Sequence, residues 1–203
     1  MKTDFTHVYI AKMPEKIGDV SAIYPERRRA YIESAKNEDV RRARYFVWRL
    51  LALALSKSLY KDINELDFTV KDGRWTTDAC HTSLSHSGGY LAVALSSSPV
   101  GVDIEAMKDV RSEKFAERIL TPREAKEYEA LSEFHRKSRL IELWSKKEAI
   151  FKSLGLSAFI PQKIDTYDVF CDTRALSYPE GELVLSIARS GESDIEIYEN
   201  IEI

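Results

Sequence analysis

Hydrophobic residues recur at helical spacing between position 37 and about position 59. The apolar side chains of this stretch form one stripe, made of Val47, Leu50, Leu51, Ala54 and Leu55. Asn37 is a favourable helix N-cap, and the acidic residues Glu38 and Asp39 after it suit the positive end of the helix dipole. The pattern predicts a long helix with one buried face.

A second stretch at helical spacing runs from about position 137 to position 154 and stops at Gly155, which suits the position after a helix C-terminus. Its apolar stripe contains Leu140, Ile141, Trp144, Phe151 and Leu154. Glu148 falls among these residues, four positions before Lys152. Such a pair is a common device of helix surfaces. Charges at the edge of a buried face are costly, however, unless they are paired or bind a metal. Both interpretations stay open on this helix alone.

Short hydrophobic runs between turn residues predict strands. They cover residues 5–11, 66–70, 82–86, 90–96, 100–105, 164–170, 183–188 and 194–198. The turns around residues 90–96 are so short that we expect antiparallel neighbours, with residues 100–105 as one arm of a meander. Pro25 is placed to start a short helix, and Thr121 to Glu124 is a capping-box sequence.

A long helix followed by strands occurs in both halves of the chain. The sequence therefore predicts an α+β fold with two lobes, each a small, mainly antiparallel sheet packed on a long helix. We expect residues 1–98 to form the N-terminal lobe and residues 99–203 the C-terminal lobe, with the divide at the Ser98-Pro99 turn.

Composition and charge indicate a globular protein and argue against a nucleic-acid-binding, secreted or membrane protein. The 203 residues are 44% hydrophobic and 31% charged, which is ordinary for a globular chain, and a net charge of −3 argues against nucleic-acid binding. The N-terminus lacks the pattern of a signal peptide, and the most apolar run, residues 50–55, is too short to cross a bilayer. Cys80 and Cys171 stand apart, which favours a reducing compartment over a structural zinc site. We therefore expect a cytoplasmic protein with no membrane partner.

Two carboxylates share one face of the strand predicted at residues 100–105. Side chains alternate along a strand, so Asp103 and Glu105 point to one side, about 6.6 Å apart, and Val102 and Ile104 point into a core. Carboxylates arranged in this way can bind a hard cation such as Mg²⁺, although any half-exposed strand shows the same alternation. Together with Glu148 they could form one Mg²⁺ site, because Mg²⁺ keeps several waters and needs few protein ligands.

Seven arginines lie between positions 27 and 49. They are Arg27, Arg28, Arg29, Arg41, Arg42, Arg44 and Arg49. One interpretation is a solvated helix face whose charges are partly paired with nearby acids. The other is an anion site, because the guanidinium group matches the geometry of phosphate.

Three motifs in a fixed order resemble those of the 4′-phosphopantetheinyl transferase superfamily, specifically the long, pseudo-dimeric type that activates peptide synthetases and other carrier proteins. They are S-L-S-H-S at residues 83–87, G-V-D-I-E at residues 101–105 and W-S-K-K-E-A-I-F-K at residues 144–152. The resemblance covers about residues 25–152. It implies two similar lobes in a pseudo-twofold arrangement, and two lobes in one chain are compatible with a monomer.

The resemblance also implies an activity. The protein would be an enzyme that transfers the 4′-phosphopantetheine arm of coenzyme A to a serine hydroxyl of an apo acyl or peptidyl carrier protein. The reaction would release 3′,5′-ADP and depend on Mg²⁺. Separately, we expect the carrier to dock on about residues 111–128, because this segment lies between the two acidic motifs and should cover the metal site.

The same resemblance assigns roles to individual residues. Asp103, Glu105 and Glu148 match the Mg²⁺ ligands, Glu148 also matches the proposed general base, and Lys152 matches the lysine beside it. The residues that match contacts to coenzyme A are Arg27, Arg42, Arg74, Ser85 and His86. On the residue alone, His86 is also compatible with a structural hydrogen-bonding role.

Three positions depart from the pattern of the family. Trp75 replaces the proline of a G-K-P-like turn, Ala30 stands where a second phosphate-binding lysine is common, and Ala43 stands where a threonine is common. Arg28 or Arg29 is a candidate substitute for the missing lysine. These departures keep open a second hypothesis, a non-catalytic protein derived from this family that binds coenzyme A or another nucleotide phosphate. A third hypothesis is an interaction protein in which all these charges are solvated pairs.

Overall fold

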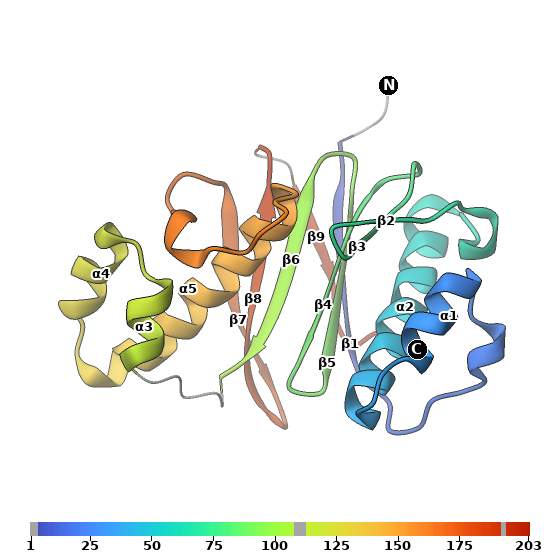
Figure 1. Ribbon diagram of the computed structural model, residues 1–203, viewed down its shortest axis with the longest axis horizontal. Coiled ribbons are helices and arrows are strands. Elements are labelled where there is room, and N and C mark those ends of the chain that lie inside the picture. Colours follow the sequence, from blue (N-terminus) through green and yellow to red (C-terminus); the bar gives the residue numbers. More distant parts are fainter. Residues whose placement is uncertain (1–3, 108–112, 192–193) are drawn as a thin grey trace. The chain divides into compact units, whose positions relative to one another are not determined.

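The computed structural model describes residues 4–107, 113–191 and 194–203. The chain divides into two compact units (Figure 1): unit 1 is Met1–Ser98 with Ser193–Ile203, and unit 2 is Pro99–Glu192. Each unit combines a sheet with a long helix, so the fold is α+β as expected. Among the described residues, none of the helices has both the length and the apolar character needed to cross a bilayer.

Unit 1 contains a four-stranded sheet in the order β4-β5-β1-β9. Its strands are β1 (Thr6–Lys12), β4 (His81–Ser87), β5 (Tyr90–Ser96) and β9 (Ile195–Tyr198). The pairs β1–β5 and β4–β5 are antiparallel, and β9 runs parallel to β1. A separate hairpin joins β2 (Thr69–Lys71) to β3 (Arg74–Thr76) through a turn at Asp72-Gly73.

The long helix of unit 1 is α2 (Glu38–Leu59), preceded by the short helix α1 (Glu26–Glu33). Asn37 caps α2, because its side-chain oxygen accepts hydrogen bonds from the backbone N–H groups of Asp39 (2.8 Å) and Val40 (3.2 Å). All five residues of the predicted apolar stripe are buried in the core beside the sheet. The predicted cap, length and buried face of this helix are therefore confirmed.

Unit 2 contains a three-stranded antiparallel sheet in the order β6-β8-β7. Its strands are β6 (Val100–Ala106), β7 (Cys171–Tyr178) and β8 (Gly181–Arg189). Its helices are α3 (Glu113–Ile119), α4 (Pro122–Glu129) and the long α5 (Glu133–Ser153). The capping box of α4 is confirmed, since Thr121 and Glu124 each accept a hydrogen bond from the other's backbone N–H. Gly155 has a positive φ of 65° after α5, as its predicted position requires.

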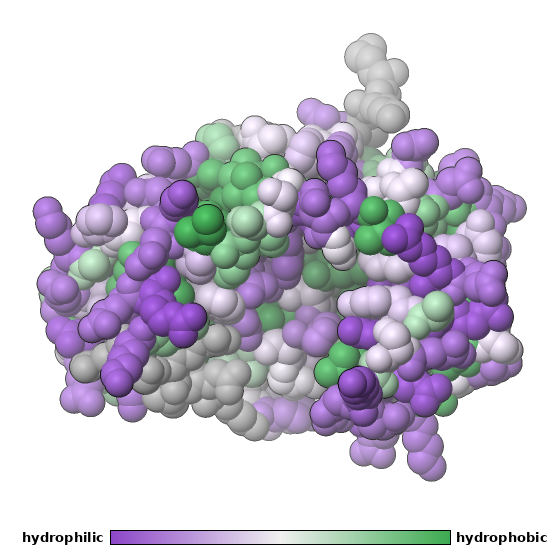
Figure 2. Space-filling view, in the orientation of Figure 1, coloured by the Kyte–Doolittle hydropathy of each residue, from purple (hydrophilic) through white to green (hydrophobic). Residues whose placement is uncertain are grey.

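Three short 3₁₀ turns complete the described elements: η1 (Val20–Ala22), η2 (Ile63–Glu65) and η3 (Pro161–Lys163). Hydrophilic residues cover most of the face seen in Figure 2. Part of the hydrophobic surface in that view lies over the segment after α5, where Leu154, Leu156 and Ile160 are exposed.

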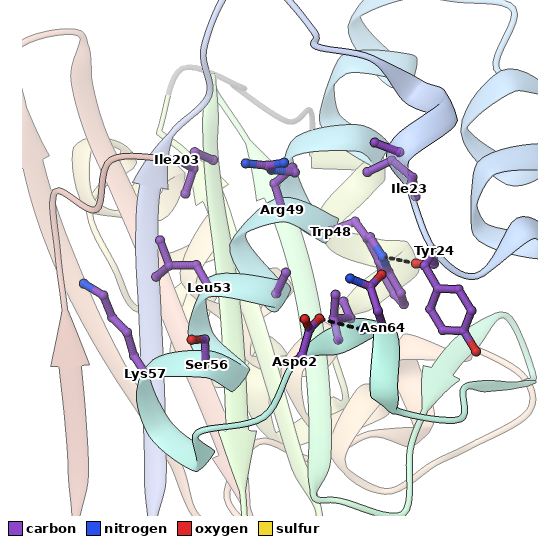
Figure 3. Close-up of a pocket in the computed structure, with 13 residues that line it drawn as sticks. Ile23, Tyr24, Trp48, Arg49, Leu53, Ser56, Lys57, Asp62, Asn64 and Ile203 are labelled. Atoms are coloured by element: carbon purple, nitrogen blue, oxygen red, sulfur yellow. Dashed lines mark hydrogen bonds between the residues drawn. The ribbon is translucent and has the colours of Figure 1, made fainter.

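A pocket of about 430 Å³ lies beside α2 in unit 1 (Figure 3). Trp48 and Leu53 supply apolar walls, and Arg49, Lys57 and Asp62 supply charge. None of the residues matched to Mg²⁺ ligands, the general base or coenzyme A contacts lines this pocket. The residues with these predicted roles lie outside this pocket.

The strand predicted at residues 164–170 is wrong, because the strand of this region is β7 and begins at Cys171. Backbone groups of the predicted segment have other partners. The carbonyl of Ile164 accepts a hydrogen bond from Lys147, and the N–H of Thr166 donates to Glu124. These groups serve a buried ion pair and so do not form a sheet ladder.

Two pairings also differ from expectation. The strand β6 does not extend a meander of β4 and β5; it pairs with β8, from Val100 opposite Arg189 to Ala106 opposite Leu183. The strand β9, expected in the C-terminal lobe, pairs with β1 of unit 1. Both partners lie far away in sequence, and turn length predicts only neighbouring pairs.

Candidate functional site

Three of the predicted residues meet between β6 and α5 of unit 2. The ammonium of Lys152 donates to Asp103 Oδ1 at 2.8 Å and to the carbonyl of Val102 at 3.1 Å. It also lies 3.6 Å from Glu148 Oε2, one helical turn away. Asp103 is buried, with 2% of its surface exposed. Two carboxylates and one ammonium from distant parts of the sequence therefore form one cluster.

Glu105 is held beside this cluster by Trp144. The indole N–H of Trp144 donates to Glu105 Oε1 at 2.8 Å, and its ring packs against Phe115 and Phe159 with centroids 5.0 and 5.3 Å away. In the sequence, Trp144 stands out only as part of the apolar stripe of the helix. A half-buried indole usually finds a hydrogen-bond acceptor, and this signal could have linked Trp144 to one of the acids.

Gly101 brings β6 against the backbone of α5. A Cβ atom at this position would lie 1.9 Å from the carbonyl oxygen of Ala149 and 2.6 Å from the backbone nitrogen of Ser153. Alternation along β6 puts Asp103 and Glu105 on the same face of the strand as Gly101, and α5 covers that face. Close contact at Gly101 thus places the acids of the strand next to the charges of the helix.

The cluster carries more negative than positive charge. Burial and the nearby carboxylates of Asp103 and Glu105 raise the pKa of Glu148 to about 7, although Lys152 acts in the opposite direction. Burial disfavours the charged form of Lys152, but Asp103 and Glu148 outweigh this effect and raise the pKa of Lys152. Glu148 is therefore poised to exchange a proton near neutral pH, whereas Lys152 stays charged.

Asp103, Glu105 and Glu148 are the candidate ligands of a metal site. Within the three stretches that the structure describes, no group of three His, Cys, Asp or Glu side chains is placed to hold a metal ion. Lys152 bridges Asp103 and Glu148, and Trp144 holds Glu105. The donor set nevertheless fits Mg²⁺, because carboxylate oxygens are its preferred ligands. A divalent cation would also offset the negative charge that raises the pKa of Glu148.

The raised pKa of Glu148 predicts how stability depends on pH. The folded state holds the Glu148 proton more tightly than the unfolded state, whose pKa is near 4.5. This contribution to stability is complete below about pH 4.5 and is lost as the pH rises through about 7. Glutamine cannot ionise, so Glu148→Gln does not lose this contribution at high pH. Its free energy of unfolding should exceed that of the wild type at pH 8 by on the order of 1–3 kcal/mol and equal it near pH 4.5.

Urea unfolding without added metal at the two pH values measures this difference. Glu142→Gln on the same helix is the control, because Glu142 pairs with Arg139 at 3.0 Å, away from the cluster. A wild type as stable as Glu148→Gln at pH 8 would contradict the raised pKa.

The five residues matched to coenzyme A contacts lie on four elements of unit 1. Arg27 is exposed on α1, and Arg42 on α2 pairs with Asp39 at 3.2 Å. Arg74 on β3 lies 3.7 Å from Asp72 in the turn before it. The remaining two, Ser85 and His86, are neighbours on β4, where Ser85 is buried and His86 is exposed. The structure thus offers basic and hydroxyl groups on this unit.

Arg28 does not substitute for the lysine that Ala30 replaces. Its guanidinium is buried, lies 4.6 Å from the ring centroid of Trp48 and 5.3 Å from that of Trp75, and donates to the carbonyl of Arg44 at 2.6 Å. Burial lowers the pKa of Arg28 to about 10. Trp75, the departure at the proline position, is therefore a core residue that packs against Arg28 and Trp48.

Comparison with known proteins supports the resemblance. A family model for the 4′-phosphopantetheinyl transferase superfamily matches residues 99–180. A 4′-phosphopantetheinyl transferase of Bacillus subtilis is 33% identical over 89 residues, which cover 44% of this chain and 38% of the relative. The 4′-phosphopantetheinyl transferase gsp of Aneurinibacillus migulanus is 32% identical over 81 residues, 40% of this chain and 34% of the relative.

A longer alignment joins the chain to the 4′-phosphopantetheinyl transferase Sfp of Bacillus subtilis strain 168. It is 28% identical over 161 residues, which cover 74% of this chain and 67% of Sfp. The two shorter alignments span only 34 to 38% of the relatives' length. The matched residues 99–180 contain Asp103, Glu105, Glu148 and Lys152. The chain is therefore similar to 4′-phosphopantetheinyl transferases, and the similarity to the superfamily model lies in residues 99–180.

Proposed function

We propose that the protein transfers the 4′-phosphopantetheine arm of coenzyme A to a serine hydroxyl of an apo acyl or peptidyl carrier protein and releases 3′,5′-ADP. The observation that carries this proposal is the cluster of Asp103, Glu148 and Lys152 within the segment that matches the family model. Glu148 is a half-buried acid whose pKa lies near neutrality in the metal-free protein, and beside a fixed ammonium it is suited to exchange a proton at physiological pH.

The reaction is a phosphoryl transfer. The serine oxygen forms a bond to the phosphorus on the pantetheine side of the pyrophosphate, and the bond from that phosphorus to the 3′,5′-ADP oxygen breaks. Glu148, whose carboxylate lies 3.6 Å from Lys152, accepts the serine proton. Lys152 holds Glu148 in place and offers positive charge to the phosphoryl oxygens.

The acids of the cluster would hold Mg²⁺ in the working enzyme. The candidate ligands are Asp103, Glu105 and Glu148, and Trp144 would orient Glu105 through its indole N–H. When bound, the ion supplies positive charge that offsets the charge of the pyrophosphate and of the departing nucleotide. The chain's own residues would position the reacting groups, which is the main contribution of protein to phosphoryl transfer.

Coenzyme A would be bound largely by unit 1. Arg27, Arg42 and Arg74 would pair with its phosphates, and Ser85 and His86 would add hydrogen bonds. Two similar lobes in a pseudo-twofold arrangement, a monomeric state and a cytoplasmic location belong to this proposal. The expected carrier-docking segment, about residues 111–128, begins outside the described residues and continues into α3 and α4.

The second candidate is a non-catalytic binder of coenzyme A. It is favoured by Ala30 and Ala43, which cannot donate side-chain hydrogen bonds to phosphate. Calorimetric titration with coenzyme A distinguishes the two. The transferase predicts binding that strengthens with Mg²⁺, and the binder predicts affinity that is independent of Mg²⁺.

Metal removal tests the proposed reaction. With coenzyme A, Mg²⁺ and an apo-carrier, the protein is expected to release 3′,5′-ADP, measurable by chromatography. EDTA should abolish the release, and excess Mg²⁺ should restore it. The control is a carrier whose acceptor serine is replaced by alanine. Release that continues with this carrier would show hydrolysis and contradict transfer.

A further inference from the structure

Lys147 and Glu124 form a fully buried ion pair in unit 2. The ammonium of Lys147 lies 2.7 Å from Glu124 Oε2, and both side chains are 0% exposed. The same ammonium donates to the carbonyl oxygens of Pro161 at 3.0 Å and Ile164 at 2.5 Å. Lys147 thus has three acceptors, which is the number of its donors.

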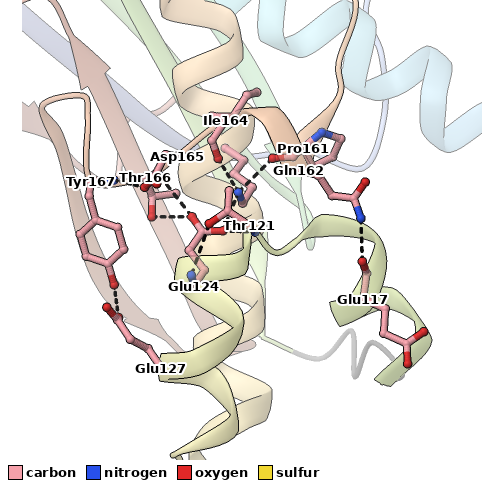
Figure 4. A network of polar contacts seen from close by, with 11 residues as sticks. Glu117, Thr121, Glu124, Glu127, Pro161, Gln162, Ile164, Asp165, Thr166 and Tyr167 are labelled. Atoms are coloured by element: carbon pink, nitrogen blue, oxygen red, sulfur yellow. Dashed lines mark hydrogen bonds and ion pairs between the residues drawn. The ribbon is translucent and has the colours of Figure 1, made fainter.

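Both carboxylate oxygens of Glu124 also accept hydrogen bonds (Figure 4). Its Oε1 accepts hydrogen bonds from the N–H (3.2 Å) and the hydroxyl (2.8 Å) of Thr166, and its Oε2 accepts one from the N–H of Thr121 (2.9 Å). The capping box at the start of α4 is therefore also one half of a buried network. This network joins α4, α5 and the segment from Pro161 to Thr166.

The net stability gained from a buried ion pair is too small to explain why this network is present. Desolvating two charges costs about as much as their attraction returns, and a well-packed apolar pair is often as stable. What a fully satisfied buried pair provides is one defined geometry, because any shift breaks several short contacts together. The element whose geometry it defines is α5, and Glu148 directly follows Lys147 on that helix.

The helix α5 is therefore held on two sides. On one side Gly101 of β6 touches the backbone at Ala149 and Ser153. On the other side Lys147 ties the helix to α4 and to the segment after it. A rotation of about 10° around the helix axis would move the end of a side chain by about 1 Å. A displacement of that size at a reacting group can lower a rate by about 100-fold.

We propose that Lys147, through its buried pair with Glu124, is a positioning residue that fixes the rotation of α5 and so places Glu148 and Lys152 against Asp103. This inference rests on the proposed transferase function. Lys147 contacts none of the three cluster residues in the contacts described above. Its effect on the reaction is exerted through the helix.

Lys147→Met tests the proposal. In the carrier assay we expect a kcat about 10- to 100-fold below the wild type. The KM for coenzyme A should change less than about threefold, because that site is proposed to lie on unit 1. The matched control is Lys146→Met, the same change one position earlier at a half-buried lysine. A kcat within threefold of the wild type in folded Lys147→Met would overturn the proposal.

Two further variants separate positioning from stability. Lys147→Met/Glu124→Gln removes both buried charges, should regain most of the stability lost in the single variant, and should keep the low kcat. Leu176→Ala in β7 removes buried apolar volume away from α5 and should lower stability without lowering kcat. If kcat follows the folded fraction in all three variants, Lys147 is merely structural and the proposal fails.

Fluorine NMR provides a readout that does not depend on activity. Of the three tryptophans, Trp144 lies on α5 beside Glu105, whereas Trp48 and Trp75 lie in unit 1. In protein labelled with 5-fluorotryptophan, Lys147→Met should shift the Trp144 resonance and leave the other two unchanged. An unchanged Trp144 resonance would overturn the proposal. A shifted resonance in a protein that transfers nothing would uphold the positioning and refute the transferase function.

Discussion

Glu148→Gln is expected to lower the rate of phosphopantetheine transfer by a factor of about 100 to 10,000. Glutamine keeps the size of the side chain but cannot accept the proton of the carrier serine. It also removes one of the three carboxylates proposed to hold Mg²⁺. Both losses act on the chemical step, so kcat should fall much more than the KM for coenzyme A rises.

Glu142→Gln is the matched control for this variant. Glu142 lies on the same helix and pairs with Arg139, outside the cluster. The control should retain transfer, and circular dichroism should show that both variants are folded. Transfer by Glu148→Gln at a rate close to that of the wild type would remove the proposed roles of Glu148 as base and metal ligand.

Gly101→Ala is expected to abolish transfer and to destabilise unit 2. Overpacking a core usually costs about 1–3 kcal/mol. The cost here should reach the upper part of that range or exceed it, because the new methyl group would meet the backbone of α5 at Ala149 and Ser153. Backbone cannot move aside as a flexible side chain can. The helix must shift away from β6, and Glu148 and Lys152 shift with it.

Urea unfolding and the carrier assay measure these two effects. Gly191→Ala is the control in the same unit, since a Cβ atom at Gly191 would meet no heavy atom of the described residues within 4 Å, apart from its own residue and its chain neighbours. This control should match the wild type in both measurements. If Gly101→Ala unfolds and transfers like the wild type, close contact between β6 and α5 is not what assembles the cluster.

The parts of the fold that could be predicted from sequence are those set by local physics. Asn37 and the Thr121–Glu124 capping box mark helix starts through contacts within a few residues, and Gly155 marks an end. The partner of β6 and the placement of β9 depend on pairing between distant segments, which local patterns do not encode. Residues 164–170 resemble a strand in sequence, but of their apolar residues only Ile164 is buried, and Tyr167 and Phe170 are exposed.

Part of the candidate site could also be predicted from the sequence. Strand alternation put Asp103 and Glu105 on one face, and helical spacing put Glu148 next to Lys152. The roles of Trp144 and Lys147 were missed, because both depend on a partner that only the tertiary structure supplies. An apolar stripe shows that a helix face is buried. It does not show which polar group on that face meets a partner.

The central claim is transfer to a carrier serine, and the mass of the intact carrier protein tests it most directly. After incubation with the protein, coenzyme A and Mg²⁺, an apo-carrier should gain the mass of one 4′-phosphopantetheine arm on its acceptor serine. A carrier with alanine at that position should gain nothing. If no carrier in a panel from fatty-acid, polyketide and peptide synthesis gains this mass, including the host's own carriers, the proposed function is contradicted.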